Sequence, residues 1–180
     1  MTTVTLTKRY SREDAQAILA KFRKNSFEEL RLLFKEGKAP TFEETEGNTV
    51  GLILALNPRV GWLLKLGSKL LFDGPFARWA GKRFLTSFSE NKRGKGINIF
   101  QNRFLPHRYI IETYIDKSLS DQSPCLVVSY PHFPSNGFGI RDELRRIDDA
   151  IFLGQTFQKL PWGKYKLQGY FVLCALIKGD

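Results

Sequence analysis

The stretch Ile140-Arg-Asp-Glu-Leu-Arg-Arg-Ile-Asp-Asp149-Ala-Ile-Phe-Leu-Gly-Gln-Thr-Phe-Gln158 contains two short alternating runs joined by the turn residues Asp148 and Asp149. Alternation with a period of two is typical of β-strands, because successive side chains point to opposite faces of a sheet. The first run places charged side chains on both faces. The stretch therefore predicts two neighbouring antiparallel strands. Whichever face of the first strand is buried, that face carries charged side chains.

Similar alternating, aromatic-rich runs occupy the chain from residue 79 to residue 177. Turn residues separate them, as expected for antiparallel hairpins. We expect eight strands, at residues 48–56, 82–88, 95–103, 107–116, 123–130, 140–147, 150–158 and 167–177. A closed barrel of about eight strands holds packed side chains or one small ligand. The predicted fold class is therefore mainly β, an antiparallel barrel of about eight strands with N-terminal helices.

The first forty residues have helical features instead. Ser11 and Ser26 each precede an acidic residue three positions on, the pattern of a capping box, and Gly37 is placed to end the second helix. We expect these helices to cap one end of the sheet. The predicted organisation of residues 1–180 is one domain, with a helical part at 1–40 and a barrel at 46–177.

An amphipathic helix is predicted at about residues 58–72, inserted in the barrel. Its apolar side chains fill one wide arc of the helical wheel, and Lys65, Ser68 and Lys69 fill the remainder. In one interpretation the helix packs on the barrel wall. In the other it is a basic lid that closes a cavity or contacts an anionic membrane surface.

Charge and cysteine content limit the partners and the compartment. There are 28 basic and 18 acidic residues, which gives a net charge of +10 and favours anionic partners. No zinc-finger or groove-reading motif accompanies the basic residues, so we do not expect nucleic acid as a partner.

Cys125 and Cys174 lie in apolar runs typical of buried free thiols, and no secretory signal or spanning segment is evident. A cytoplasmic protein is expected, peripheral to a membrane if the 58–72 helix contacts lipid.

Four segments carry a resemblance to a known family: Trp79-Ala-Gly-Lys-Arg-Phe84, Arg145-Arg-Ile-Asp-Asp149, Phe152-Leu-Gly154 and Gly169-Tyr-Phe-Val172. In their order and spacing they resemble uncharacterised bacterial proteins with a Gly-x-Trp-x-Gly motif, which look lipocalin-like, or calycin-like. The likeness extends from about residue 42 to residue 177. It implies a β-barrel that binds an apolar or amphipathic small molecule, and it implies no catalytic residue.

The chain departs from that family at the motif itself. The matching segment is Gly47-Asn-Thr-Val-Gly51, with Thr49 where the family has Trp. Lipocalin-like barrels use such a Trp to plug the closed end. By this resemblance, Trp79 or Trp62 has to take its place.

Two interpretations of the charged run Arg141–Asp149 are open. Arg141, Glu143 and Arg145 share one face of a strand. In the first interpretation they make cross-strand pairs on a solvated edge. In the second they face the barrel interior, where an arginine needs an internal carboxylate such as Glu112 or an anionic ligand. The ligand-binding residues predicted by the second interpretation are Arg141, Arg145, Tyr109, Thr113 and Gln155.

Motifs for catalysis and metal binding are missing from the sequence. His107 and His132 have no metal-ligand spacing, and no Gly-x-Ser-x-Gly elbow occurs. Gly94-Lys-Gly96 predicts a hairpin turn, because it lacks the helix start of a phosphate loop. We therefore expect no catalytic residue, metal or cofactor.

The predicted function is the binding or carriage of a hydrophobic or amphipathic small molecule inside the barrel, with an anionic molecule as one option. One alternative is an enzyme that acts on such a molecule, which would show a polar cluster of perturbed acidity at the floor of its pocket. The other is a peripheral membrane or interaction protein that uses the 58–72 helix.

Overall fold

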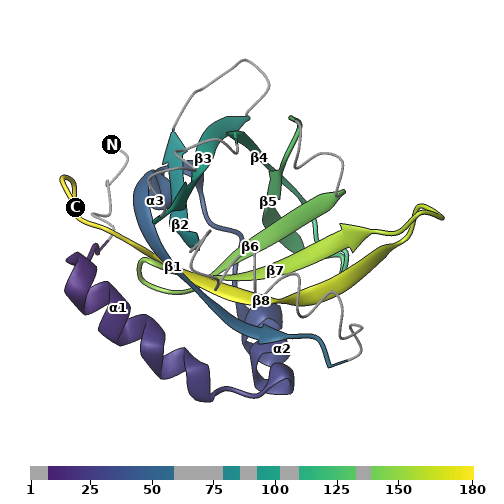
Figure 1. Ribbon diagram of the computed structural model, residues 1–180, viewed down its shortest axis with the longest axis horizontal. Helices are drawn as coiled ribbons and strands as arrows, with labels where there is room; N and C mark the ends of the chain where they lie inside the picture. The colour runs from purple at the N-terminus through teal and green to yellow at the C-terminus, as the bar shows by residue number, and fades with distance from the viewer. Residues whose placement is uncertain (1–7, 59–78, 86–92, 102–109, 133–138) are drawn as a thin grey trace, which may run out of the picture.

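The computed structural model describes residues 8–58, 79–85, 93–101, 110–132 and 139–180, and within them eight strands form a closed antiparallel barrel (Figure 1). The strands are β1 (Gly47–Leu56), β2 (Trp79–Leu85), β3 (Gly94–Phe100), β4 (Ile110–Lys117), β5 (Pro124–Ser129), β6 (Ile140–Asp148), β7 (Ile151–Lys159) and β8 (Tyr165–Ala175). Each strand pairs with its neighbours in the sequence, and β8 returns to pair with β1. The predicted fold class is confirmed. The predicted helix at 58–72 lies outside the described residues, apart from Pro58.

The two helices predicted in the first forty residues are present, as α1 (Arg12–Lys21) and α2 (Phe27–Glu36). The short 3-10 helix η1 (Phe22–Lys24) and helix α3 (Phe42–Thr45) were not predicted. Ser11 accepts a hydrogen bond from the Asp14 amide, Ser26 and Glu29 form a complete capping box, and Gly37 caps α2. Among the described helices none is long and apolar enough to cross a membrane.

We expected the N-terminal helices to cap an end of the barrel. Instead, α1 and α2 lie against its outer wall (Figure 1). Their apolar faces bury Leu19, Leu30 and Phe34 against outward-pointing side chains of the wall, such as Val172. The expectation was wrong because the outer faces of β1, β7 and β8 are themselves apolar and need cover. This outer core comprises Ala15, Leu19, Leu30, Phe34, Val50, Ile151, Leu153, Tyr170, Val172, Cys174 and Leu176.

A second core fills one end of the barrel interior. It comprises Phe84, Ile111, Leu126, Val128, Leu144, Ala150, Phe152, Phe171, Leu173 and Ala175, with Phe42 and Tyr10 packed against it. Members from six strands meet in this cluster, which is possible only inside the closed sheet. Phe42 belongs to α3, so the end of the barrel next to α3 is the closed one. We call the opposite end, where β1 ends and β2 begins, the distal end.

Two glycines make room for aromatic rings in the interior. The Phe171 ring covers Gly154 and the Trp79 indole covers Gly51, so a Cβ at either glycine would overlap the ring. Trp79 and Phe171 meet edge to face, with centroids 5.5 Å apart. Trp79 is therefore an interior aromatic, but it is the first residue of β2 and lies toward the distal end. Phe42 and Tyr10, rather than Trp79, cover the closed end; Trp62 lies outside the described residues.

Candidate functional site

A lysine lies inside the barrel. Lys82 is on β2 with the same parity as Phe84, and its side chain is 2% exposed. Its ammonium group has three acceptors: Asn98 Oδ1 at 2.9 Å, the Tyr130 hydroxyl at 2.6 Å and Asp142 Oδ2 at 3.0 Å. An ammonium group has three hydrogens, so its donor capacity is fully used by the protein itself.

Asp142 is the matching carboxylate. It lies near the start of β6, with the same inward parity as Leu144. The Tyr130 hydroxyl donates to its Oδ2 at 2.5 Å, and the Thr156 hydroxyl donates to its Oδ1 at 2.8 Å. The ion pair is thus surrounded by neutral hydrogen-bonding groups. We refer to Lys82, Asn98, Tyr130, Asp142 and Thr156 as the Lys82 cluster.

The Lys82 cluster lies between the inner apolar core and the distal end. Tyr130 directly follows β5, Asn98 is near the end of β3, and Asp142 pairs with Thr156 in the half of β7 that leads away from α3. Phe84 and Leu144, by contrast, point into the apolar core on the closed side. The cluster therefore forms a polar layer across the barrel, with a packed core beneath it.

Three aromatic rings surround the Lys82 ammonium. The nitrogen lies 5.6 Å from the Trp79 ring centroid, 5.1 Å from that of Tyr130 and 5.5 Å from that of Phe171. Trp79 also donates its indole N–H to Asn98 Oδ1 at 3.3 Å. Ring faces attract a cation most where water is excluded, so the Trp79 and Phe171 contacts support a charged lysine at a buried position. Tyr130 contacts the ammonium through its hydroxyl.

Burial shifts the acidity of two members of the cluster. Desolvation lowers the pKa of Lys82, and the negative charge of Asp142 opposes that shift. Desolvation, together with the adjacent Asp142 carboxylate, raises the pKa of Tyr130 well above its ordinary value. Short hydrogen bonds link Lys82 to Tyr130 and Tyr130 to Asp142. Titratable groups perturbed in this way are typical of functional sites.

The predicted ligand residues Arg141 and Arg145 lie on the opposite face of β6, outside the barrel. The Arg145 side chain is 0% exposed, and it donates to the two carboxylate oxygens of Asp121 at 2.6 and 2.8 Å. It also donates to the carbonyl of Phe34 in α2 at 3.1 Å and lies over the Phe34 ring at 4.6 Å. Arg145 therefore joins the barrel wall to α2 and to the turn between β4 and β5.

Arg141 has internal partners as well. It donates to Glu143 at 2.9 Å and to the Lys117 carbonyl at 2.8 Å. Glu143, itself buried, accepts from the Ser118 hydroxyl at 2.6 Å. The charged face is thus neither a solvated edge nor an interior surface, because the sheet is closed and the turn at 118–123 covers it. Glu112 is not the partner; it pairs with Arg93 at 3.4 Å.

The structure places the four described members of the predicted ligand set on two different faces of the sheet. Thr113 is buried on the inward face of β4, next to Gly94. Gln155 is on the outward face of β7, where its amide donates to Ser120 at 3.1 Å. Tyr109 lies outside the described residues. Gln155 lies opposite Glu143 and therefore shares the outward face with Arg141 and Arg145, whereas Thr113 does not. A ligand-binding role for any of them stays a prediction.

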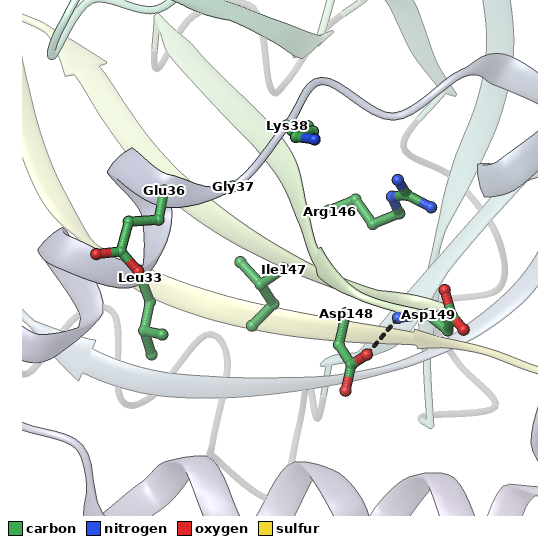
Figure 2. A pocket seen from close by; sticks show the side chains of 8 residues that line it. All are labelled: Leu33, Glu36, Gly37, Lys38, Arg146, Ile147, Asp148 and Asp149. Carbon is green, nitrogen blue, oxygen red and sulfur yellow. Dashed lines mark hydrogen bonds between the residues drawn. The ribbon is translucent and has the colours of Figure 1, made fainter.

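A small pocket is present on the outside of the barrel, between the end of α2 and the end of β6 (Figure 2). It measures about 280 Å³ and is lined by Leu33, Glu36, Gly37, Lys38, Arg146, Ile147, Asp148 and Asp149. Arg146 pairs with Glu44 at 3.0 Å, and the Asp148 carboxylate accepts from the Asp149 amide at 2.7 Å. Nowhere in the described ranges do three His, Cys, Asp or Glu residues gather in a way that could hold a metal.

The two cysteines are buried, free thiols. Burial raises the pKa of Cys125 to about 12 and that of Cys174 to about 11. Thiols with such pKa values are weak nucleophiles at neutral pH, because little thiolate is present. Neither cysteine is a candidate for covalent chemistry.

Comparisons with known proteins support the fold alone. No family model matches the sequence, and no curated protein matches it. A crystal structure of a protein from Thermomonospora curvata is similar, with a TM-score of 0.52 and 16% identity over 92% of this chain and 97% of that chain. At this identity the likeness shows a shared fold. The resemblance to lipocalin-like bacterial proteins stays a prediction.

We expect the Lys82–Asp142 pair to be strongly coupled. Lys82→Met or Asp142→Leu alone leaves one unpaired charge inside the barrel and should cost about 3–5 kcal/mol of stability. The double variant removes both charges and should cost clearly less than the sum of the two. Urea unfolding of the four proteins measures this double-mutant cycle. Additive losses would show that the two side chains are not partners.

Asp121 should make stability depend on acid pH. The hydrogen bonds from Arg145 hold the pKa of this carboxyl below its ordinary value of 3.8. A lowered folded-state pKa contributes stability that is complete above the unfolded-state value and is lost as pH falls through the folded-state value. Unfolding free energies of wild type and Asp121→Asn, measured from pH 7 downwards, should therefore converge below about pH 4. Curves that stay parallel into acid would contradict the assignment.

Proposed function

We propose that the protein binds a hydrophobic or amphipathic small molecule in the distal half of the barrel, with the polar group of the molecule against the Lys82 cluster. Barrels of about eight strands are of a size that can hold one small ligand. The apolar core on the side of α3 is packed, so the ligand would lie on the other side of the cluster. The lipocalin-like resemblance of the sequence supports the same function.

The observation that carries the proposal is the buried ion pair itself. Replacing a buried pair with well-packed apolar side chains of similar volume often leaves stability unchanged or increases it. The barrel nevertheless has Lys82 and Asp142 in its interior, both at most 5% exposed, with hydrogen bonds to Tyr130, Asn98 and Thr156. A buried polar layer of this kind contributes little to stability, but it offers hydrogen-bonding groups that could recognise the polar group of a ligand.

The chemistry of the cluster points to a ligand group that accepts hydrogen bonds. Lys82, Tyr130 and Thr156 are donors, and each now donates to an acceptor within the cluster. A carboxylate or similar group could take over a donor hydrogen bond from Asp142, especially at Lys82, and a hydroxyl could do so more weakly. The net charge of +10 adds a general preference for anions. An anionic amphiphile is therefore the preferred class.

An enzyme acting on the bound molecule is a second candidate. The observation that favours it is the chain of short hydrogen bonds from Lys82 through Tyr130 to Asp142, at 2.6 and 2.5 Å, between groups of shifted pKa. Such a chain could move a proton to or from a bound molecule. A membrane-contact function of the 58–72 helix rests on residues outside the described ranges and stays a prediction.

The binding proposal is tested by calorimetry with dodecanoate and dodecanol. Wild type should bind dodecanoate, and the Lys82→Met/Asp142→Leu variant should bind it about tenfold or more weakly, because a charge-assisted hydrogen bond is lost. Dodecanol should bind the two proteins with similar affinity. The two amphiphiles differ only in the head group. A loss of dodecanoate binding alone would show that the variant no longer recognises the carboxylate, whereas a loss of both would show that it no longer binds the alkyl chain.

Two single variants serve as controls. Arg141→Gln removes a cation from the outer face and should leave dodecanoate binding unchanged, as should Arg93→Gln at the exposed pair with Glu112. If Arg141→Gln weakens binding and the Lys82→Met/Asp142→Leu variant does not, the ligand site is on the outer face and the proposal is wrong. If wild type binds neither amphiphile, the proposal fails for this ligand class. Recovery of a modified ligand from the wild-type mixture would favour the enzyme.

A further inference from the structure

The hairpin that joins β7 to β8 ends in an exposed tryptophan. Trp162 is 69% exposed, and Tyr165 beside it is 40% exposed. The turn is closed by hydrogen bonds from the Leu160 amide to the Lys164 carbonyl at 2.7 Å and from the Gly163 amide to the Leu160 carbonyl at 2.9 Å. Gly163 has a φ of +85°, which glycine adopts without strain. A bonded turn therefore presents the indole to solvent.

This exposure is exceptional within the molecule. Among the large hydrophobic side chains in the described ranges, Trp162 has the greatest exposed fraction, and Trp side chains are normally largely buried. The hairpin extends beyond the body of the barrel, at the right of Figure 1. A Cβ placed at the neighbouring Gly163 would meet no atom of the described residues within 4 Å. With this exposure, Trp162 can contact another surface while the turn keeps its conformation.

The hairpin is also uniformly basic. Lys159 and Lys164 flank the turn and are both exposed. From Ala150 to Gly179 the sequence contains neither Asp nor Glu, although it contains several lysines. Positive charge at the tip is therefore not balanced by acidic side chains along the two strands.

Exposed aromatic rings beside lysines are the composition of surfaces that contact the membrane–water interface. Trp and Tyr prefer the level of the lipid headgroups, and lysines are attracted to anionic lipids. We propose that the tip formed by Lys159–Tyr165 docks the protein on an anionic lipid surface. The charge of the tip selects an anionic surface, and Trp162 supplies the apolar contact.

Docking through this tip would orient the barrel. The tip belongs to the distal end, because β7 ends and β8 begins there. The Lys82 cluster lies toward the same end, so an amphipathic molecule could pass between the lipid and the barrel. That last consequence rests on the proposed function, whereas docking does not.

Vesicle sedimentation at low salt tests the docking. The full chain should sediment with vesicles of phosphatidylcholine and phosphatidylglycerol, and far less with phosphatidylcholine alone. Trp162→Ala should weaken partitioning about tenfold, through loss of buried apolar area. Lys159→Gln/Lys164→Gln should weaken it about 25-fold, at about fivefold per lysine.

Matched variants elsewhere on the surface are the controls. Leu32→Ala removes an exposed apolar side chain from α2, and Lys21→Gln/Lys24→Gln removes the same charge from the region of α1 and η1. Both should sediment like wild type. Equal losses in the control and hairpin variants would overturn the proposal, as would failure of wild type to sediment. Binding of a single-stranded oligonucleotide through the hairpin lysines, with no binding to vesicles, would assign the tip to nucleic acid instead.

The two proposals fail separately. Trp162→Ala should bind dissolved dodecanoate like wild type, because the indole is exposed on the hairpin whereas Lys82 is buried inside the barrel. The Lys82→Met/Asp142→Leu variant should sediment with anionic vesicles like wild type. A variant that loses both properties at once would show that hairpin and interior are one site.

Discussion

Closure of the sheet between β1 and β8 is the constraint from which the other features follow. Once the sheet is closed, each strand directs one parity of its side chains into a confined interior and the other outward. Charged residues on the inward parity then have to find partners within the barrel. Lys82 and Asp142 do so across the interior, from β2 and β6, and they convert what would be a continuous apolar core into a core with a polar layer.

The charges of β6 are divided between two environments. Asp142 points inward to Lys82, whereas Arg145 points outward to Asp121 and to the end of α2. Both ion pairs have a nearly or fully buried cation, but they have different consequences. The outward pair holds a helix and a turn against the wall, as a structural element would. Within the described residues, the hydrogen-bond partners of the inward pair come from the barrel strands and from Tyr130, and for that reason this pair is the better candidate for contact with a ligand.

The sequence was sufficient to predict the strands, because alternation and turn residues are local properties. It was also sufficient for the capping of α1 and α2. It could not show which parity of β6 faces inward, since both faces of the strand carry charged side chains. In the structure the face of Arg141, Glu143 and Arg145 points outward, and Arg145 donates to the Phe34 carbonyl of α2.

Lys82 was missed as a site residue for a related reason. The available signal was its shared parity with Phe84 in a short aromatic strand, which places the lysine on the apolar face. Its partners Asn98, Tyr130 and Asp142 come from three other strands or their ends, at separations that no local pattern reports. The exposed hairpin, in contrast, is visible in the sequence as Pro161-Trp-Gly-Lys164, but only the structure shows that Trp162 is 69% exposed.

The most direct test of the account is the NMR signal of the Lys82 side-chain nitrogen during titration with dodecanoate. An ammonium with three internal acceptors should give a protected resonance, assigned by its loss in Lys82→Met. We expect that resonance to shift as dodecanoate binds, while the exposed lysines change little. Saturable binding of dodecanoate with no change at Lys82 would contradict the claim that the buried ion pair recognises the ligand.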